Sequence, residues 1–226
     1  MLKRTIWPIL FGLLGCGILL ALGFWQVDRL AWKEALLADI EARIADAPQS
    51  LPDDPVAAED QYLPVAVSGA ILDGEITILA SLRSAGPVYR IIRAFETEAG
   101  RRILIDMGFV READRAAARP GGAEVDLIGN LYWPDEIDSY TPAPDLEAGI
   151  WFARDIPAMA EALNTDPVLV VLRQAPQTDL GVTPFPVDTG AIPNDHLSYA
   201  ITWFLLAAVW LGMTLFLLWR IRQRTN

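Results

Sequence analysis

The sequence predicts a membrane protein in which two transmembrane helices flank a β-rich extracytoplasmic domain. Two charge-free apolar runs, at residues 6–25 and 197–219, contain 20 and 23 residues. A helix of about 20 residues crosses a hydrocarbon core of about 30 Å. Short runs rich in β-branched residues lie between them, separated by turn signals. We therefore expect two spans and one α+β domain built on an antiparallel sheet or small barrel.

The charges at the two ends of the chain predict its orientation. Residues 1–5 contain two basic residues and residues 220–226 contain three, while neither tail has an acidic residue. Positive charge is retained preferentially on the cytoplasmic side of a membrane. Both tails should therefore be cytoplasmic, with residues 26–196 on the opposite side.

A cleavable signal is the alternative interpretation of the first run. The sequence Leu-Leu-Gly-Cys at residues 13–16 loosely resembles a lipoprotein cleavage box around Cys16. Apolar sequence continues for nine residues past Cys16 without a small-x-small site, whereas processed signals end their apolar region near the cut. We therefore expect this run to remain as a span. Cys16 is also the only cysteine, so no internal disulfide can form.

The segment between the spans is strongly acidic. All 29 acidic residues but only 13 of the 18 basic ones fall within residues 26–196, which gives that segment a formal charge of −16. Such a surface repels nucleic acid and anionic headgroups, so nucleic acid is excluded as a partner. We expect proteins or a hydrophobic ligand as partners, with the lipid bilayer around the spans.

The extracytoplasmic segment divides into four parts. Helical periodicity predicts a stalk over residues 26–47, and the acidic, proline-rich residues 48–61 predict a linker. Residues 62–176 are the expected β-rich core, and residues 177–196 the expected return loop to the membrane.

Seven strands and one short helix are expected in the core. The helix is predicted from Asp155 to Leu163, with Asp155 as its N-cap. Turn signals occur at Asp73-Gly74, at residues 84–87 and at Ala99-Gly100. The expected strands are residues 62–69, 75–82, 88–97, 101–110, 125–132, 150–154 and 168–174.

The residue inventory argues against an enzyme. With one histidine at a membrane boundary and one cysteine inside a span, the domain can form no Ser-His-Asp or Cys-His couple and no zinc site of His or Cys type. No glycine-rich nucleotide-binding pattern occurs. Acidic pairs such as Asp53-Asp54 and Asp135-Glu136 lie in turn-like contexts that are typical of solvated loops. We therefore expect a non-enzymatic protein.

The only histidine, His196, lies on the threshold of the second apolar run. Aromatic and small residues follow it at helical spacing, so they share its face. Such a face could give a flat macrocycle an apolar wall, and a neutral imidazole could ligate its iron. An interfacial histidine that only hydrogen-bonds water or headgroups is the alternative. The residues 3, 4, 7, 11 and 14 positions beyond it are Tyr199, Ala200, Trp203, Ala207 and Trp210.

The end of the first span supplies further candidates at the same membrane level. Trp25 could add an aromatic ring to the apolar wall. Arg29 and Lys33 are cations that could pair with the propionates of a porphyrin. Snorkelling at the membrane interface is the alternative role of these two cations.

Two junction motifs resemble those of the Surfeit locus protein 1 family, the assembly factors of haem–copper cytochrome c oxidase. They are Gly-x-Trp-Gln-x-x-Arg-Leu-x-Trp-Lys at residues 23–33 and Asn-x-His-Leu-x-Tyr-Ala-x-Thr-Trp at residues 194–203. The resemblance covers most of the chain. It departs at residues 107–109, Met-Gly-Phe, where the family tends to have an Arg-Gly-Trp turn, and at residues 86–89, where the usual Gly-Tyr is interrupted. The chain therefore resembles a divergent member.

The resemblance implies haem a as a transiently bound cofactor and His196 as the axial ligand of its iron. It implies subunit I of the oxidase as the recipient, a haem a synthase as a candidate donor, and the inner (cell) membrane of a bacterium as the location. Copper carriage is disfavoured by the residues themselves, because the domain has two methionines and no thiol for cuprous ion. The further haem-binding residues expected beside the ligand are Tyr199, Trp203, Trp25 and Arg29.

Three functional hypotheses follow. The first is a non-enzymatic assembly factor that receives haem a through His196 and helps to insert it into subunit I. The second is a cofactor-free membrane scaffold that stabilises an oxidase assembly intermediate. The third is a two-pass polysaccharide chain-length regulator, which shares the topology but would carry long helices where β-like runs occur here.

Overall fold

The chain forms two compact units in its computed structural model. One unit comprises residues 1–39 and 189–226, and the other comprises residues 40–188. The residues that the structure describes are 2–82, 86–119, 121–174, 180–190 and 192–224, with side chains from residue 6 onward.

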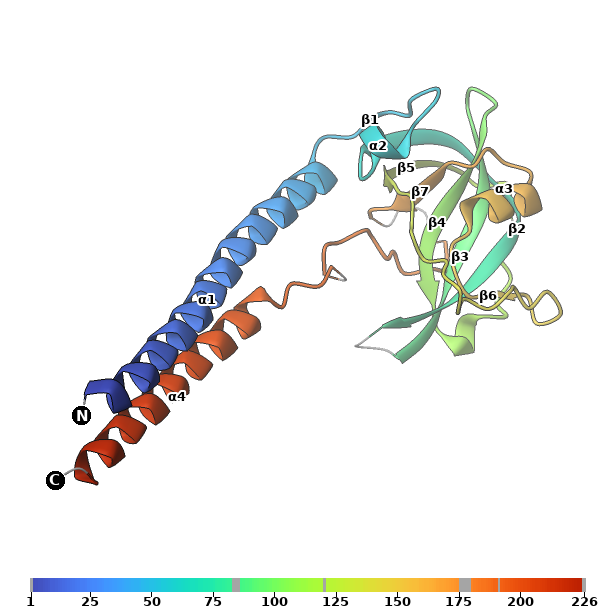
Figure 1. The fold of residues 1–226 in the computed structure, drawn as a ribbon. Helices are drawn as coiled ribbons and strands as arrows, with labels where there is room; N and C mark the ends of the chain where they lie inside the picture. The colour runs from blue at the N-terminus through green and yellow to red at the C-terminus, as the bar shows by residue number, and fades with distance from the viewer. Residues whose placement is uncertain (1, 83–85, 120, 175–179, 191, 225–226) are drawn as a thin grey trace. The chain divides into compact units, whose positions relative to one another are not determined.

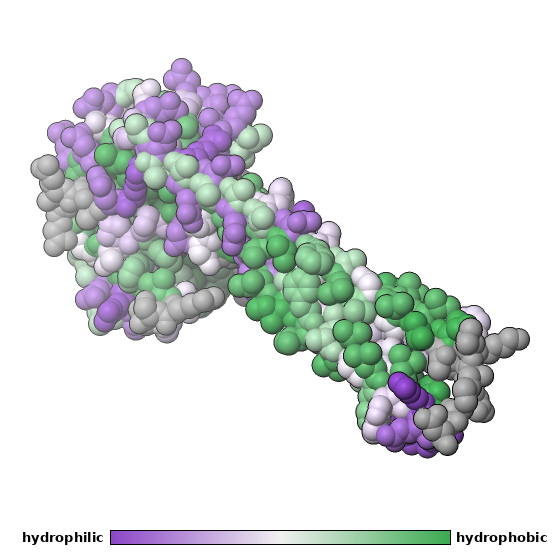
Figure 2. Space-filling model, turned by 90° about the vertical axis from the view of Figure 1, so that its left-hand side faces the viewer, coloured by the Kyte–Doolittle hydropathy of each residue, from purple (hydrophilic) through white to green (hydrophobic). Residues whose placement is uncertain are grey.

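The first unit is a pair of helices. Helix α1 spans Leu2–Ala45 and helix α4 spans His196–Gln223, and each is long and apolar enough to cross a membrane. The two helices lie side by side in Figure 1, and the surface over them is mainly hydrophobic in Figure 2. The expected fold class is confirmed, because two long apolar helices at the termini flank a β-rich domain.

Glycines of α1 allow the two helices to approach closely. A Cβ atom at any of three glycines would lie 2.2–2.5 Å from a side chain of α4. Small residues of this kind are typical of helix contacts within membranes, where close packing drives association. We call this contact the interhelical seam. Its glycine contacts, which show that the helices run antiparallel, are Gly12 with Thr214, Gly15 with Trp210 and Gly23 with Phe204.

The second unit contains a closed β-barrel. Five strands pair in the order β2, β3, β4, β7 and β5, and an additional pairing of β2 with β5 closes the ring. Closure removes the free edges that an open sheet of these strands would expose. The strands are β2 (Pro64–Leu82), β3 (Gly86–Thr97), β4 (Arg102–Val110), β5 (Glu124–Leu131) and β7 (Leu169–Leu172).

Several short elements complete this unit. Helix α3 covers Ile156–Leu163, and the predicted N-cap is confirmed because Oδ1 of Asp155 accepts a hydrogen bond from the Ala158 amide at 3.1 Å. The segment predicted as a linker contains two short elements, and two more lie after β4. These are β1 (Gln49–Ser50), α2 (Ala57–Asp60), η1 (Glu112–Asp114) and β6 (Ile150–Trp151).

Strand β2 is one continuous strand where the sequence predicts two. The turn expected at Asp73-Gly74 is wrong, because the pairing of β2 with β3 shifts register between Ile71 and Glu75. Gly74 has a φ of 89°, which suits an irregularity within a strand rather than a hairpin. The resulting bend lets the first part of β2 pair with β5 and the second part with β3.

One barrel pairing departs from the expected antiparallel sheet. Strands β4 and β7 are parallel, with Leu104 opposite Leu169. The chain between them contains η1, β5, β6 and α3, and a long connection of this kind is what parallel neighbours require. The domain therefore has a mixed sheet.

Apolar clusters lie on both sides of the barrel wall. Phe95 and Ile105 belong to one cluster, while Leu104 and Met159 belong to a second cluster that includes α3. Successive residues of a strand point to opposite faces, so β4 is buried on both faces. This double burial explains why its sequence is almost continuously apolar.

Within the second unit, which includes residues 40–45 at the end of α1, side chains of the barrel cap that end of the helix. Arg173 donates hydrogen bonds to the carbonyl oxygens of Ala45, at 2.9 Å, and Asp46, at 3.0 Å. Nδ2 of Asn130 donates to the carbonyl oxygen of Ile44 at 3.0 Å. The last carbonyl groups of a helix have no intrahelical partner, so these two side chains satisfy the end of α1.

Candidate functional site

The imidazole of His196 lies against α1. His196 is the first residue of α4, and its Nδ1 is 2.7 Å from Oε1 of Gln26. His196 is half-buried, and Gln26 is only 8% exposed. This hydrogen bond connects the two junction motifs, because Gln26 belongs to the first and His196 to the second.

The other ring nitrogen of His196 remains available. Within the described part of the chain, Nε2 makes no hydrogen bond. A neutral imidazole has one nitrogen that donates and one that accepts. With Nδ1 engaged by Gln26, Nε2 is the nitrogen that can bind a metal centre from outside the chain.

The remaining predicted site residues are Trp25, Arg29, Tyr199 and Trp203. No hydrogen bond or ring contact joins them to His196 among the residues that the structure describes. Trp25 and Tyr199 are 53% and 56% exposed, and Trp203 is half-buried. The guanidinium of Arg29 lies 4.2 Å from the centroid of the Trp32 ring, a cation–π contact.

The face of α4 that was expected to receive a macrocycle is largely occupied by the interhelical seam. Ala200 and Ala207, expected as gaps between aromatic rings, are 2% and 3% exposed. Trp210 contacts Gly15, and its Nε1 donates to the carbonyl oxygen of Gly12 at 3.1 Å. A planar ligand of His196 therefore cannot lie along this whole face, whereas the candidate rings of Trp25 and Tyr199 are exposed.

Sequence reasoning missed Gln26 as a site residue. It follows Gly12, Gly15 and Gly23 along α1 at intervals of three, eight and three residues, which are close to one, two and one helical turns. This spacing places Gln26 on the buried face of the helix. An uncharged polar residue on that face needs a partner, and this requirement was the available signal.

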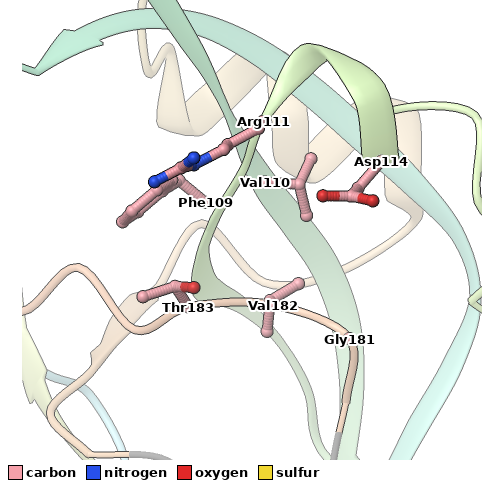
Figure 3. Close-up of a pocket in the computed structure, with 7 residues that line it drawn as sticks. All are labelled: Phe109, Val110, Arg111, Asp114, Gly181, Val182 and Thr183. Atoms are coloured by element: carbon pink, nitrogen blue, oxygen red, sulfur yellow. The ribbon is translucent and has the colours of Figure 1, made fainter. Parts of the chain in front are cut away.

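The barrel domain has a separate pocket of about 390 Å³ at the end of β4. Figure 3 shows Arg111 and Asp114 extending to opposite sides of Val110. The far wall belongs to residues 181–183, which are held because the amides of Phe109 and Thr183 donate to each other's carbonyl oxygens at 2.8 and 2.9 Å. None of the predicted site residues lines this pocket.

No cluster of three or more His, Cys, Asp or Glu side chains is placed to hold a metal ion in the described ranges of the chain.

The fold and this site define a class: a membrane protein with two apolar terminal helices, one barrel domain, and a single imidazole held by an amide across the helix pair. Comparison with known proteins narrows the class. The model of the SURF1 family matches residues 13–208. The chain therefore belongs to the SURF1 family, whose members are cytochrome oxidase assembly factors and generally non-catalytic.

Individual relatives agree with this assignment. Surfeit locus protein 1 of Rattus norvegicus is 31% identical over 209 residues, which cover 83% of this chain and 68% of the relative. The SURF1-like protein of Monosiga brevicollis is 33% identical over 217 residues, covering 87% and 82%. The bacterial SURF1-like protein of Rickettsia felis is 27% identical over 199 residues, covering 84% and 87%.

Proposed function

We propose that this protein binds haem a through Nε2 of His196 and helps to insert it into subunit I of cytochrome c oxidase. The observation that carries the proposal is the pairing of His196 Nδ1 with Gln26 at 2.7 Å. A histidine that ligates a metal usually donates its second N–H group to a neighbouring acceptor. The arrangement found here leaves one imidazole nitrogen for an incoming iron.

The residues near His196 suit a transient haem site. Trp25 and Tyr199 offer exposed aromatic rings, which can cover a porphyrin, with Trp203 as a further candidate. Arg29 is an exposed residue and can pair with a propionate. One protein ligand suits delivery, because a second strong axial ligand would slow release to the recipient. Haem a is therefore the cargo of the protein rather than its resident cofactor.

The membrane arrangement is part of the proposal. Residues 6–25 and 197–219 would be the spans, with the tails 1–5 and 220–226 in the cytoplasm of a bacterium. Residues 26–196 would then lie in the periplasm, with the helical stalk, linker, β-rich core and return loop at the boundaries that the sequence predicts. The recipient would be subunit I, and a haem a synthase would be the donor.

Haem retention by the purified protein tests the ligand assignment. The full chain is co-expressed with the enzymes of haem a synthesis, purified in detergent, and its haem content is read from the visible spectrum. We expect the wild type to carry haem a and His196→Ala to lose most of it. Trp219→Ala is a matched control, because Trp219 is an exposed aromatic residue at the other end of α4. Equal haem in the wild type and His196→Ala would refute the assignment.

The scaffold hypothesis predicts a different result for His196→Ala. The domain that would contact an assembly intermediate belongs to a segment with a formal charge of −16, which favours basic protein surfaces. If the protein is only a scaffold, an oxidase assembled with His196→Ala has normal haem occupancy, and losses follow substitutions on the domain surface instead. The chain-length regulator lacks support, because the domain is a barrel and the chain belongs to the SURF1 family.

A further inference from the structure

We propose that Gln26 is a positioning residue that selects Nε2 of His196 as the ligand nitrogen. It also limits how strongly Nε2 donates its lone pair to iron. The inference deepens the proposed function and rests on it wherever haem is concerned. The choice of ligand nitrogen concerns only the two side chains and can be tested without haem. The juxtaposition that carries it is the 2.7 Å contact between a buried amide oxygen and the chain's only imidazole.

The contact determines which ring nitrogen carries the proton. Oε1 of Gln26 is a carbonyl oxygen and can only accept a hydrogen bond. If Nδ1 were unprotonated, two lone pairs would face each other across 2.7 Å. With Oε1 facing the ring in this structure, Nδ1 is the donor, which places the single proton of the neutral ring on Nδ1 and leaves the lone pair on Nε2.

The surroundings of Gln26 hold its amide in place. Gln26 is 8% exposed and lies one helical turn from Gly23, which contacts Phe204 in the interhelical seam. A hydrogen bond is stronger in such an apolar environment, and an unpaired amide would be costly there. The helix pair therefore fixes the acceptor, and the acceptor fixes the ring of His196.

The neutrality of Gln26 sets how strongly His196 can bind. A carboxylate in the same position would draw the Nδ1 proton further and make Nε2 a stronger donor to iron. An amide oxygen fixes the same tautomer but attracts the Nδ1 proton less strongly. Such a ligand binds its cargo in a defined geometry but does not hold it permanently, as a delivery protein requires.

The single histidine makes the tautomer directly measurable. In the full-length haem-free chain labelled with ring-15N histidine and reconstituted in nanodiscs, the only imidazole signals come from His196. The spectrum is recorded at mildly alkaline pH. We expect the protonated nitrogen to be Nδ1. A ring with its proton mainly on Nε2 overturns the inference.

Two substitutions distinguish the effect of having an acceptor at position 26 from the effect of a charge there. Gln26→Leu removes the acceptor at similar volume, so the proton should move largely to Nε2 and the affinity for haem b, used as the probe, should fall about 10–100-fold. Gln26→Glu keeps an acceptor and adds charge, so the Nδ1 proton should stay. Haem should then dissociate more slowly, with a more negative iron reduction potential. An unchanged tautomer in Gln26→Leu, or unchanged dissociation in Gln26→Glu, contradicts the corresponding half of the proposal.

A matched control tests whether loosening of the helix pair explains such changes. Trp210→Phe removes another interhelical hydrogen bond, from Nε1 of Trp210 to Gly12, and should leave the tautomer of His196 as in the wild type. A change equal to that of Gln26→Leu would overturn the positioning role. If Gln26→Leu does not fold, the tautomer of the wild type and the behaviour of Gln26→Glu still decide the question.

The outcomes distinguish this inference from the proposed function. If the tautomer depends on Gln26 but His196→Ala retains haem, the ligand assignment fails while the role of Gln26 in fixing the ring stands. If haem requires His196 but Gln26→Leu keeps both the tautomer and the affinity, the positioning inference fails alone.

Discussion

Asp106 of β4 is fully buried and accepts a hydrogen bond from Nε of Arg90, on the neighbouring strand β3, at 2.8 Å. Nη1 of Arg154 lies 3.4 Å from the same carboxylate, and Arg154 also pairs with Glu136. Nη2 of Arg90 donates a hydrogen bond to the carbonyl oxygen of Phe185 at 3.2 Å. These four charged side chains form one ion cluster in the barrel domain.

Breaking this ion cluster should destabilise the domain strongly. Asp106→Asn leaves the guanidinium groups of Arg90 and Arg154 without their shared buried anion. Removal of one partner from a buried ion pair typically costs about 3–5 kcal/mol. We expect a loss of this size in the free energy of unfolding, measured by urea titration of the full chain in detergent.

An exposed ion pair provides the control for that measurement. Glu96 and Arg102 are paired, with side chains 39% and 46% exposed. Because solvent screens such pairs, Glu96→Gln should change the free energy of unfolding by less than about 1 kcal/mol. Similar losses in Asp106→Asn and Glu96→Gln would show that burial of the cluster contributes little.

The pH dependence of domain stability should include a contribution from Glu136. Burial would raise the pKa of the Glu136 carboxyl, but the hydrogen bonds and charge of Arg154 outweigh burial and hold this pKa below its ordinary value. Burial would also lower the pKa of Arg154, but its contacts with Glu136 and Asp106 outweigh burial and raise it. Arg154 therefore stays charged over the acidic range in which Glu136 titrates.

The sign follows from proton binding. Because the folded-state pKa of Glu136 is depressed, the unfolded chain binds more protons between the two pKa values. The stabilisation is complete above the ordinary glutamate pKa of about 4.3 and is lost as the pH falls from there through the lower folded pKa. The difference in unfolding free energy between the wild type and Glu136→Gln should shrink over this window. A difference that stays constant with pH would contradict the prediction.

The closed barrel shows which features of the fold can be predicted from sequence. Short runs rich in β-branched residues located the strands, and Asp155 marked the start of α3, because both signals are local. The join at Gly74 and the parallel pairing of Leu104 with Leu169 depend on which strands meet in space. Such partners are far apart in sequence, so local patterns do not determine them.

The candidate site shows the same limit. His196 could be singled out because one histidine at a membrane boundary is a local observation. Gln26 lies 170 residues away in sequence, and only the pairing of α1 with α4 brings the two together. The burial of Ala200 and Ala207 could not be predicted for the same reason, since the sequence of α4 alone does not show which face another helix covers.

Gly108 should be required for the docking of residues 181–183 on β4. Its φ is 112°, and a Cβ atom there would lie 2.1 Å from the carbonyl oxygen of Thr183. Gly108→Ala combines backbone strain with a clash against backbone that cannot easily move, each costing about 1–3 kcal/mol. We expect faster hydrogen exchange at the amides of Phe109 and Thr183, which hold the segment.

Gly100 is the matched position for that experiment. It also has a positive φ, 80°, but a Cβ atom there would meet nothing within 4 Å. Gly100→Ala should therefore carry only the local strain of about 1 kcal/mol and should leave exchange at Phe109 and Thr183 unchanged. Equal exchange rates at these two amides in Gly108→Ala and the wild type would refute the requirement.

Gly23 should be required for the hydrogen bond between Gln26 and His196, because it sets the local distance between the two helices. A Cβ atom at Gly23 would lie 2.5 Å from the ring of Phe204, and overpacking of this kind typically costs about 1–3 kcal/mol. In Gly23→Ala the Phe204 ring must move, so the contact between Phe24 and Phe204, with ring centroids 5.4 Å apart, should weaken in NMR spectra. The ring-15N signals of His196 should shift with it.

Gly17→Ala is the control that shows whether any glycine-to-alanine substitution in α1 has the same effect. No atom lies within 4 Å of a Cβ placed there, and alanine is favoured over glycine within a helix by roughly 0.5–1 kcal/mol. Gly17→Ala should therefore preserve the Phe24–Phe204 contact, the signals of His196 and the haem content. If Gly23→Ala leaves all three as they are in Gly17→Ala, close approach at Gly23 does not position His196. If only Gly23→Ala changes them, helix packing and ligand geometry are coupled through one turn of α1.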